Sequence, residues 1–260
     1  MEIPIYQIDA FTDHLFGGNP AAVCPLAEWL PDEIMQRIAA ENNLAETAFF
    51  TRENDHFHIR WFTPVVEVDL CGHATLATAH TLYAHLGFTE NEIRFISRSG
   101  WLKVRKNEDR LTLDFPADPV APAEPPEELI ASLGFRPTET FKGKTDWMVI
   151  LRNQKEVEAI HPNLNLMTEV TGRGVIVTAP GKEVDFVSRF FAPQSGVPED
   201  PVTGSAHTTL APFWGKRLGK QELTAIQVSK RRGHLTCRLN GDRVEISGKA
   251  VTYLIGEIII

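Results

Sequence analysis

The chain has 260 residues, of which 43% are apolar and 23% charged, and its formal net charge is −8. This composition is ordinary for a globular protein, and the length suits one large domain or two small ones. The acidic balance disfavours nucleic-acid binding, which needs a surface rich in lysine and arginine, and no apolar run approaches the ~18 residues that span a bilayer.

Alternating polarity and β-branched or aromatic residues predict most of the regular structure before the middle of the chain. The predicted strands are residues 3–8, 47–52, 56–61, 92–97, 101–105 and 110–115. Helices are predicted over residues 32–41, where Pro31 supplies a favourable first turn, and over residues 73–86, which end before a glycine.

After the middle of the chain, strands again outnumber helices. A helix is predicted over residues 127–133, and strands over residues 147–151, 174–178, 185–190, 225–229, 234–239, 243–247 and 251–255. A last helix begins near Gly204, and Pro212 is expected to stop or kink it. Many consecutive strands with few helices between them favour an α+β fold.

The segment from Pro116 to Pro126 holds five prolines in eleven residues. Because proline can neither donate to a sheet nor continue a helix interior, this segment is expected to be an extended linker. It predicts two domains, residues 1–117 and 118–260.

The two halves contain an internal repeat. Residues 57–64 (FHIRWFTP) align without gaps to residues 186–193 (FVSRFFAP), with four of eight positions identical at an offset of 129. After a three-residue insertion, residues 67–74 align to 199–206, so that Gly72 and Gly204 each open a helix. A helix start presents unpaired backbone N–H groups and a positive dipole end, which suit an anionic ligand.

Only three cysteines occur, Cys24, Cys71 and Cys237, and they are widely spaced. An odd, scattered set disfavours a disulfide framework or a structural zinc site and indicates a reducing compartment. The first residues lack the basic and apolar regions of a secretory signal, so a cytoplasmic protein without membrane association is expected.

Four segments in order carry a resemblance to a known family. They are residues 16–23 (FGGNPAAV), 43–49 (NLAETAF), 71–75 (CGHAT) and 196–207 (GVPEDPVTGSAH). Together they resemble the phenazine-biosynthesis PhzF-like isomerase family over essentially the whole chain. The resemblance implies the diaminopimelate-epimerase-like fold, in which two similar domains each wrap a β-barrel-like sheet around a central helix, with a cleft at a pseudo-two-fold axis. In this fold the last strand can return to the first domain.

The resemblance also implies site residues and a reaction. The family's acid/base carboxylate falls on Glu46, and its other site residues fall on His73, Asp200 and Ser205. The member that names the family moves a proton on a dihydro-hydroxyanthranilate without a metal or an organic cofactor. We therefore expect a cofactor-independent isomerase of a small anionic carboxylic acid, cyclic or amino, and no metal site.

The residues themselves fit these roles. Glu46 lies among apolar neighbours, so desolvation is expected to raise its pKa towards neutrality, and at the offset of 129 it aligns with Val175. His73 at a helix start is expected to be neutral. The backbone of Gly72 and Gly204, with Ser205, can bind a substrate carboxylate, although Ser205 could instead cap its helix.

Two other functions remain open from the sequence. The first is a two-base amino-acid epimerase or racemase of the same fold, in which Cys71 would be one thiol; the repeat places Thr203 at the second position, and its hydroxyl is far too weak an acid. The second is a non-catalytic protein that binds a small ligand. The apolar tail, residues 255–260, needs burial and motivates a predicted homodimer.

Overall fold

The computed structural model describes residues 1–260, which form two compact units. The first unit is Met1–Asp114 together with Ser247–Ile260, and the second is Phe115–Ile246. The predicted boundary after residue 117 falls close to the structural one. The last strand lies with the first unit, which is the return that the resemblance allows for this fold.

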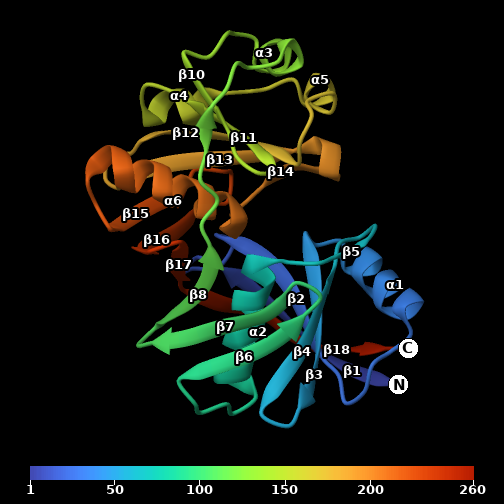
Figure 1. Ribbon diagram of the computed structural model, residues 1–260. Helices are drawn as coiled ribbons and strands as arrows, with labels where there is room; N and C mark the ends of the chain where they lie inside the picture. The colour runs from blue at the N-terminus through green and yellow to red at the C-terminus, as the bar shows by residue number, and fades with distance from the viewer. The chain divides into compact units, whose positions relative to one another are not determined.

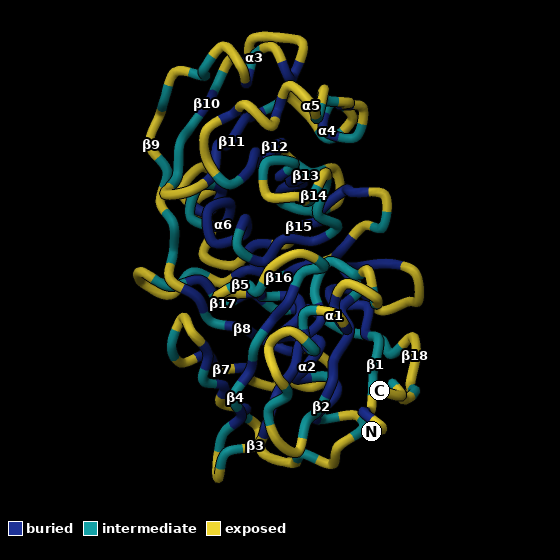
Figure 2. The backbone as a smooth tube through the Cα atoms, turned by 90° about the vertical axis from the view of Figure 1, so that its right-hand side faces the viewer, coloured by how far each residue is buried: buried dark blue, intermediate teal, exposed yellow.

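In the first unit, the strands curve around one central helix, α2 (Gly72–His85), which is buried along most of its length (Figures 1 and 2). A second helix, α1 (Asp32–Asn42), packs against β3 and β4 on the outside. The strands are β1 (Glu2–Ala10), β2 (Asn19–Pro25), β3 (Glu46–Glu53), β4 (His56–Phe62), β5 (Glu67–Val68), β6 (Glu92–Ser97), β7 (Gly100–Asn107), β8 (Arg110–Pro116) and β18 (Ala250–Ile259).

The second unit has a similar plan, with the strands around helix α6 (Gly204–Leu218). Three short helices are α3 (Glu127–Leu133), α4 (Gln154–Ala159) and α5 (Leu164–Met167), and one 3₁₀ turn is η1 (Pro193–Ser195). The strands are β9 (Ala121–Pro122), β10 (Glu139–Lys142), β11 (Asp146–Ile150), β12 (Gly174–Pro180), β13 (Phe186–Ala192), β14 (Val197–Asp200), β15 (Glu222–Gln227), β16 (Gly233–Asn240) and β17 (Arg243–Gly248).

The two units repeat one sheet topology. In the first, β2 runs parallel to β3, β3 antiparallel to β4, β4 parallel to β6, and β6 antiparallel to β7. In the second, β11, β12, β13, β15 and β16 pair in the same order and senses. The short strands β5 and β14 also pair antiparallel with equivalent partners. The predicted α+β fold of two similar domains, each around a central helix, is therefore confirmed.

The repeat extends to an ion pair before each central helix. Arg60 binds Glu67 with a shortest contact of 2.8 Å, and Arg189 binds Glu199 with one of 2.7 Å. Each guanidinium also lies over the aromatic ring two residues further on, at 5.2 and 4.8 Å from its centre. Both arginine side chains are well shielded from solvent, and two parallel N–H···O bonds fix the orientation of such a pair. These pairs hold the turn that leads into α2 and α6.

The strand register corrects one detail of the sequence alignment. Phe62 in β4 lies opposite Thr47, and its aligned partner in β13 lies opposite Val175. The structural counterpart of Glu46 is therefore Gly174, and not the predicted Val175. Both residues lack a carboxylate, so Glu46 is still a feature of the first unit alone.

Helix α6 also differs from the prediction, because it continues through Pro212 to Leu218. Proline removes one backbone donor and leaves the carbonyl four residues earlier, that of Thr208, without its helical partner. The backbone N–H of Asp118 donates to this carbonyl at 3.1 Å, which replaces the lost bond. A tertiary hydrogen bond thus lets the helix tolerate the proline.

The proline-rich segment is extended as predicted, but it is not only a linker. Its residues Ala121 and Pro122 form β9 and pair with β10, since the neighbouring Ala123 N–H donates to the carbonyl of Thr140. The sequence analysis also missed β2, β5, β10, β14, α4 and α5. Five of these are short elements with weak periodicity, and β2 begins with the turn-forming Asn19-Pro20 pair.

The C-terminal tail lies in β18, which pairs antiparallel with β1 along its whole length. This pairing gives the backbone N–H and C=O groups of β18 hydrogen-bond partners, yet Ile255 and Ile259 remain 62% and 82% exposed. The homodimer stays a prediction, which light scattering can test. No helix in the chain is long and apolar enough to cross a membrane.

Replacing Gly18, which precedes β2, is expected to destabilise the first unit. Gly18 has φ +61°, and a Cβ atom there would overlap the backbone carbonyl oxygen of Ala10. We expect Gly18→Ala to lower the free energy of unfolding by about 3 kcal/mol, because both strain and a backbone clash oppose it. Gly87 has φ +69° with nothing within 4 Å of the added atom, so Gly87→Ala should cost only about 1 kcal/mol. Urea unfolding measures the stability of both variants. If the two substitutions lower the free energy of unfolding equally, a clash at Gly18 does not explain the effect.

Candidate active site

Three elements of the first unit begin at one place. Strands β2 and β3 are parallel, so they start at the same edge of the sheet, and α2 packs against both. Glu46 is the first residue of β3 and His73 the second residue of α2. The Nε2 atom of His73 lies 3.2 Å from the Oε2 atom of Glu46, although without the directional geometry of a hydrogen bond. The fold thus brings together two of the predicted site residues.

The other nitrogen of His73 is surrounded by donors. The Asn19 side-chain amide nitrogen lies 3.2 Å from Nδ1, and the Cys71 sulfur lies 3.5 Å from it. Because both groups donate, Nδ1 accepts, and the neutral ring then carries its proton on Nε2, the nitrogen nearest to Glu46. Asn19 is the first residue of β2, so the element that the sequence analysis missed supplies the residue that sets this tautomer.

Burial lowers the pKa of His73 to about 3, because the charged imidazolium would lose its hydration. This direction agrees with the neutral state that the sequence predicts for His73. The sequence analysis attributed it to the helix dipole, whereas burial is the cause that the structure gives. The Glu46 side chain is more accessible, with 16% of its surface exposed. A neutral N–H donor therefore lies beside a carboxylate that solvent or a ligand can reach.

The first turn of α2 has no side-chain cap. Cys71 occupies the N-cap position with extended backbone, and its side chain makes no capping hydrogen bond to the helix, which begins at Gly72. Thr75 instead bonds back to the Cys71 carbonyl through its hydroxyl. Unpaired N–H groups at the positive end of a helix are a favourable place for an anion.

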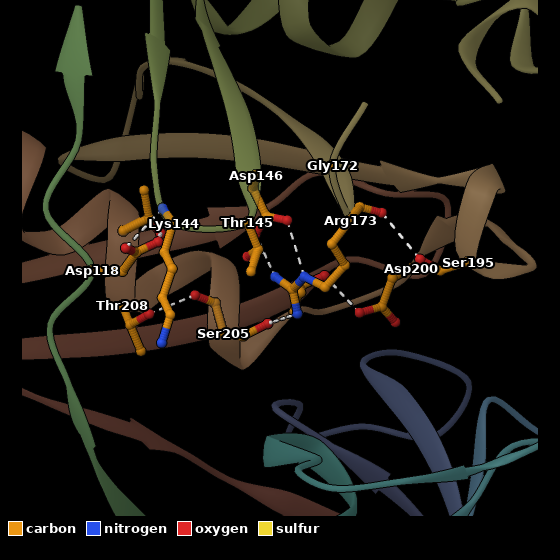
Figure 3. A network of polar contacts seen from close by, with 12 residues as sticks. Asp118, Lys144, Thr145, Asp146, Gly172, Arg173, Ser195, Asp200, Ser205 and Thr208 are labelled. Atoms are coloured by element: carbon orange, nitrogen blue, oxygen red, sulfur yellow. Dashed lines mark hydrogen bonds and ion pairs between the residues drawn. The ribbon is translucent and has the colours of Figure 1, made fainter. Parts of the chain in front are cut away.

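The second unit carries a different polar network, which Figure 3 shows. Arg173 lies between β11 and α6, and donates to both carboxylate oxygens of Asp146, with one contact at 2.9 Å. Its remaining nitrogen donates to the Ser205 hydroxyl oxygen at 2.7 Å. The guanidinium pKa is raised, since hydrogen bonding and the charges of Asp146 and Asp200 outweigh the opposing effect of burial. Ser205 therefore accepts from a permanent cation and does not cap its helix, because the N-cap residue is Thr203.

Asp200 ends β14 in the turn before α6. Its carboxylate accepts from the Thr203 hydroxyl at 2.6 Å, and its backbone carbonyl accepts from the fully buried Gln227 amide at 2.7 Å. The Gln227 side-chain oxygen accepts from the Thr203 N–H at 2.8 Å. Gln227 therefore fixes the turn that leads to Gly204.

The predicted site residues fall into two sets. Glu46, Gly72 and His73 lie together in the first unit, and Asp200, Gly204 and Ser205 lie together in the second. The prediction that one cleft unites the sets stays a prediction.

Sequence reasoning missed three residues that hold these sets in place: Asn19, Arg173 and Gln227. Asn19 lay inside a segment that carried the family resemblance, which was a usable signal. Arg173 stood between two glycines directly before a buried strand, a weaker signal, and Gln227 offered none.

Removing the Arg173 side chain is expected to destabilise the second unit, because it leaves the buried carboxylate of Asp146 without its cationic partner. Asp146 is 1% exposed, while the Arg173 side chain is 38% exposed. We expect Arg173→Met to cost about 2–3 kcal/mol, somewhat below the range for a fully buried pair. The matched control is Arg217→Met, whose ion pair with Glu139 is 42% exposed on both sides and should cost less than about 1 kcal/mol. Urea unfolding compares the two variants. If the double variant Arg173→Met/Asp146→Asn is no more stable than Arg173→Met alone, the unpaired carboxylate is not the cause of the loss.

Two similar units, each with its strands around a central helix, give this chain an epimerase-like fold. A hydroxyproline epimerase from Agrobacterium vitis matches over 99% of this chain and 92% of its own, with a TM-score of 0.60 and 12% identity, which supports the fold alone.

The chain matches the model of phenazine biosynthesis-like proteins over residues 8–256, and it belongs to this PhzC-PhzF family. An uncharacterized isomerase from Pseudomonas aeruginosa is 50% identical over 258 residues, which cover 99% of each chain. A PhzF-family crystal structure from Enterococcus faecalis is 46% identical, covers 100% of both chains and has a TM-score of 0.97.

Proposed function

We propose that this protein is an isomerase that moves a proton on a small carboxylic acid, cyclic or amino, with Glu46 as the general acid and base. The observation that carries the proposal is the 3.2 Å approach of His73 Nε2 to Glu46 Oε2 at an uncapped helix start. Membership of a family in which curated relatives are named isomerases supports the reaction class.

The proposed reaction needs one proton carrier and one electron shift. The Glu46 carboxylate takes a proton from a carbon next to an electron-withdrawing group, and the C–H electron pair moves into the conjugated system. The same carboxyl group then returns the proton to another carbon of that system, so that no electrons are gained or lost. A positioned carboxylate of this kind contributes about 10²–10⁴-fold to the rate.

His73 keeps the carboxylate available for this task. The ring is neutral because burial lowers its pKa to about 3, so it does not lock Glu46 in a full ion pair. The Nε2–H group of His73 lies beside the carboxylate. It can donate a hydrogen bond to Glu46 when the carboxylate is charged, and release that bond when Glu46 takes up the substrate proton. The raised pKa of Glu46 that the sequence predicts stays a prediction.

We propose that the two helix starts bind the polar groups of an anionic substrate. Gly72 and Gly204 contribute backbone N–H groups of the first turns, to which the N-cap side chains make no hydrogen bond. In the second unit, the Ser205 hydroxyl oxygen accepts a hydrogen bond from Arg173. Because Arg173 cannot accept in return, the Ser205 hydroxyl proton can be donated to a ligand. Asp200 offers the one carboxylate of that set that could bind a substrate amine.

The two-thiol epimerase is the less favoured alternative. Its second thiol would stand at Thr203, and the Thr203 hydroxyl donates to Asp200. Burial raises the pKa of the other two thiols, Cys24 and Cys237, to about 12, so neither provides a thiolate near neutral pH. None of these three residues can therefore serve as the second base.

Solvent exchange tests the proposal. The protein is incubated in D₂O with dihydro-hydroxyanthranilate and a panel of small cyclic and amino carboxylic acids, and NMR detects deuterium on carbon. Incorporation with a shifted double bond supports the isomerase. Interconversion of stereoisomers alone would favour the epimerase, and tight binding without exchange would favour a non-catalytic binding protein.

A further inference from the structure

Glu46, Cys71 and His73 form a compact set of metal-ligand atoms. Each residue offers one such atom, a carboxylate oxygen, a thiol sulfur and an imidazole nitrogen, and the three atoms lie within 4.8 Å of one another. They come from the first residue of β3, the N-cap of α2 and the second residue of that helix. Two rigid elements therefore hold the set in place.

The surroundings favour a ligand here. His73 is buried, with 5% of its surface exposed, yet its Nε2 atom makes no hydrogen bond. A buried polar atom without a hydrogen bond is costly, and such an atom in a folded protein calls for an explanation. Cys71 is 7% exposed, and its sulfur lies 3.5 Å from Nδ1, the other nitrogen of the same ring.

We propose that Glu46, Cys71 and His73 bind a thiophilic divalent transition-metal ion, for which Zn²⁺ is the best match. Zn²⁺ accepts sulfur, nitrogen and oxygen together, and open zinc sites use three protein ligands with water as the fourth. Magnesium and calcium, in contrast, prefer sites made of oxygen alone.

The geometry is close to what such a site needs. Zn²⁺ holds these ligand types at about 2.0–2.3 Å, so tetrahedral neighbours stand roughly 3.3–3.8 Å apart. The 3.2 Å contact between Nε2 and Oε2 already fits this range. The Cys71 sulfur contacts the other ring nitrogen, Nδ1, at 3.5 Å, so a rotation of the Cys71 side chain has to bring it closer to Nε2.

The charges also balance. One thiolate and one carboxylate neutralise a divalent cation, so the buried site gains little net charge. Asn19 beside the ring can turn its amide oxygen towards the other imidazole nitrogen and accept from it, as a partner behind a metal-bound histidine commonly does.

Metal binding and proton transfer should exclude each other. This consequence rests on the proposed function, because the metal would occupy the lone pair of Glu46 and the nitrogen of His73. The bound ion would therefore inhibit the isomerase. The binding itself does not depend on that function.

A cobalt titration tests the binding. Untagged protein is freed of metal with a chelator and titrated with Co²⁺, whose thiolate complexes absorb in the near ultraviolet. We expect a band that saturates at one ion per chain and disappears when Zn²⁺ is added. The band should be lost in Cys71→Ser and kept in Cys237→Ser, a control at another buried thiol. A folded wild-type protein without the band, or a band that survives Cys71→Ser, overturns the proposal.

A second variant keeps the test decisive if Cys71→Ser does not fold. Glu46→Gln should retain the thiolate band while Co²⁺ affinity falls at least about tenfold, and unchanged affinity overturns the carboxylate ligand. Zn²⁺ should also stop the deuterium exchange of the wild type, and a chelator should restore it. A cobalt band without any exchange activity refutes the proposed function alone, whereas exchange without a band refutes the metal site alone.

Discussion

Glu46→Gln is expected to lower the rate of deuterium incorporation from solvent into substrate by at least about 100-fold. Glutamine has the same shape as glutamate but cannot accept and return the proton, so the loss reflects acid/base chemistry. Ligand affinity, measured by calorimetry with the same compound, should change little because the helix starts remain intact. The rate loss should therefore appear in kcat and not in KM.

The matched control is Glu53→Gln at the other end of the same strand. Glu53 is 44% exposed and pairs with His56 and His58, outside the candidate site. This variant should keep the full exchange rate and also control for a general effect of removing a charge from β3. Full activity in Glu46→Gln, or an equal loss in Glu53→Gln, would show that another group moves the proton.

Acidification from pH 8 to pH 5 is expected to lower the free energy of unfolding by about 6 kcal/mol. Burial lowers the pKa of His73 to about 3, and of His80 and His207 to about 4, from an ordinary value of 6.5. Between these values the unfolded chain binds three protons that the folded chain does not, so stability falls as the pH falls. Each histidine contributes about 2 kcal/mol at pH 5, from about 1.4 kcal/mol for each pH unit below 6.5.

Urea unfolding at pH 8, 7, 6 and 5 measures this slope. His207→Gln should reduce the slope by about one third, whatever its cost at pH 8, because one of the three buried imidazoles is gone. His234→Gln is the matched control, since that ring is exposed on β16. A stability that is flat above pH 5 would contradict the neutral state of the three rings.

The proton carrier and its partner could be named from the sequence, but their contact could not. Glu46 and His73 came from local segments that carry the family resemblance. Their 3.2 Å approach depends on the parallel pairing of β2 with β3 and on the packing of α2 against both strands. Neither the pairing nor β2 itself was predicted, because Asn19-Pro20 resembles a turn.

The second set shows the same limit. Ser205 and Asp200 were named from the repeat and the resemblance, whereas Arg173 was missed although it fixes Ser205 directly. Position 173 has no distinctive spacing from position 205, and its role depends on the buried carboxylate at Asp146. Partners that are distant in sequence leave no periodic trace.

By itself, the sequence determined that this protein is a duplicated α+β chain, with a glycine opening one central helix in each half. Local patterns encode this much, because strand alternation, helix starts and repeated motifs are properties of short segments. Tertiary structure alone decided that helix α6 passes through Pro212, that β18 pairs with β1, and that Asn19 and Cys71 lie beside His73. The physical reason is that hydrogen bonds and burial between distant segments set these features, and they override local preference where the two disagree.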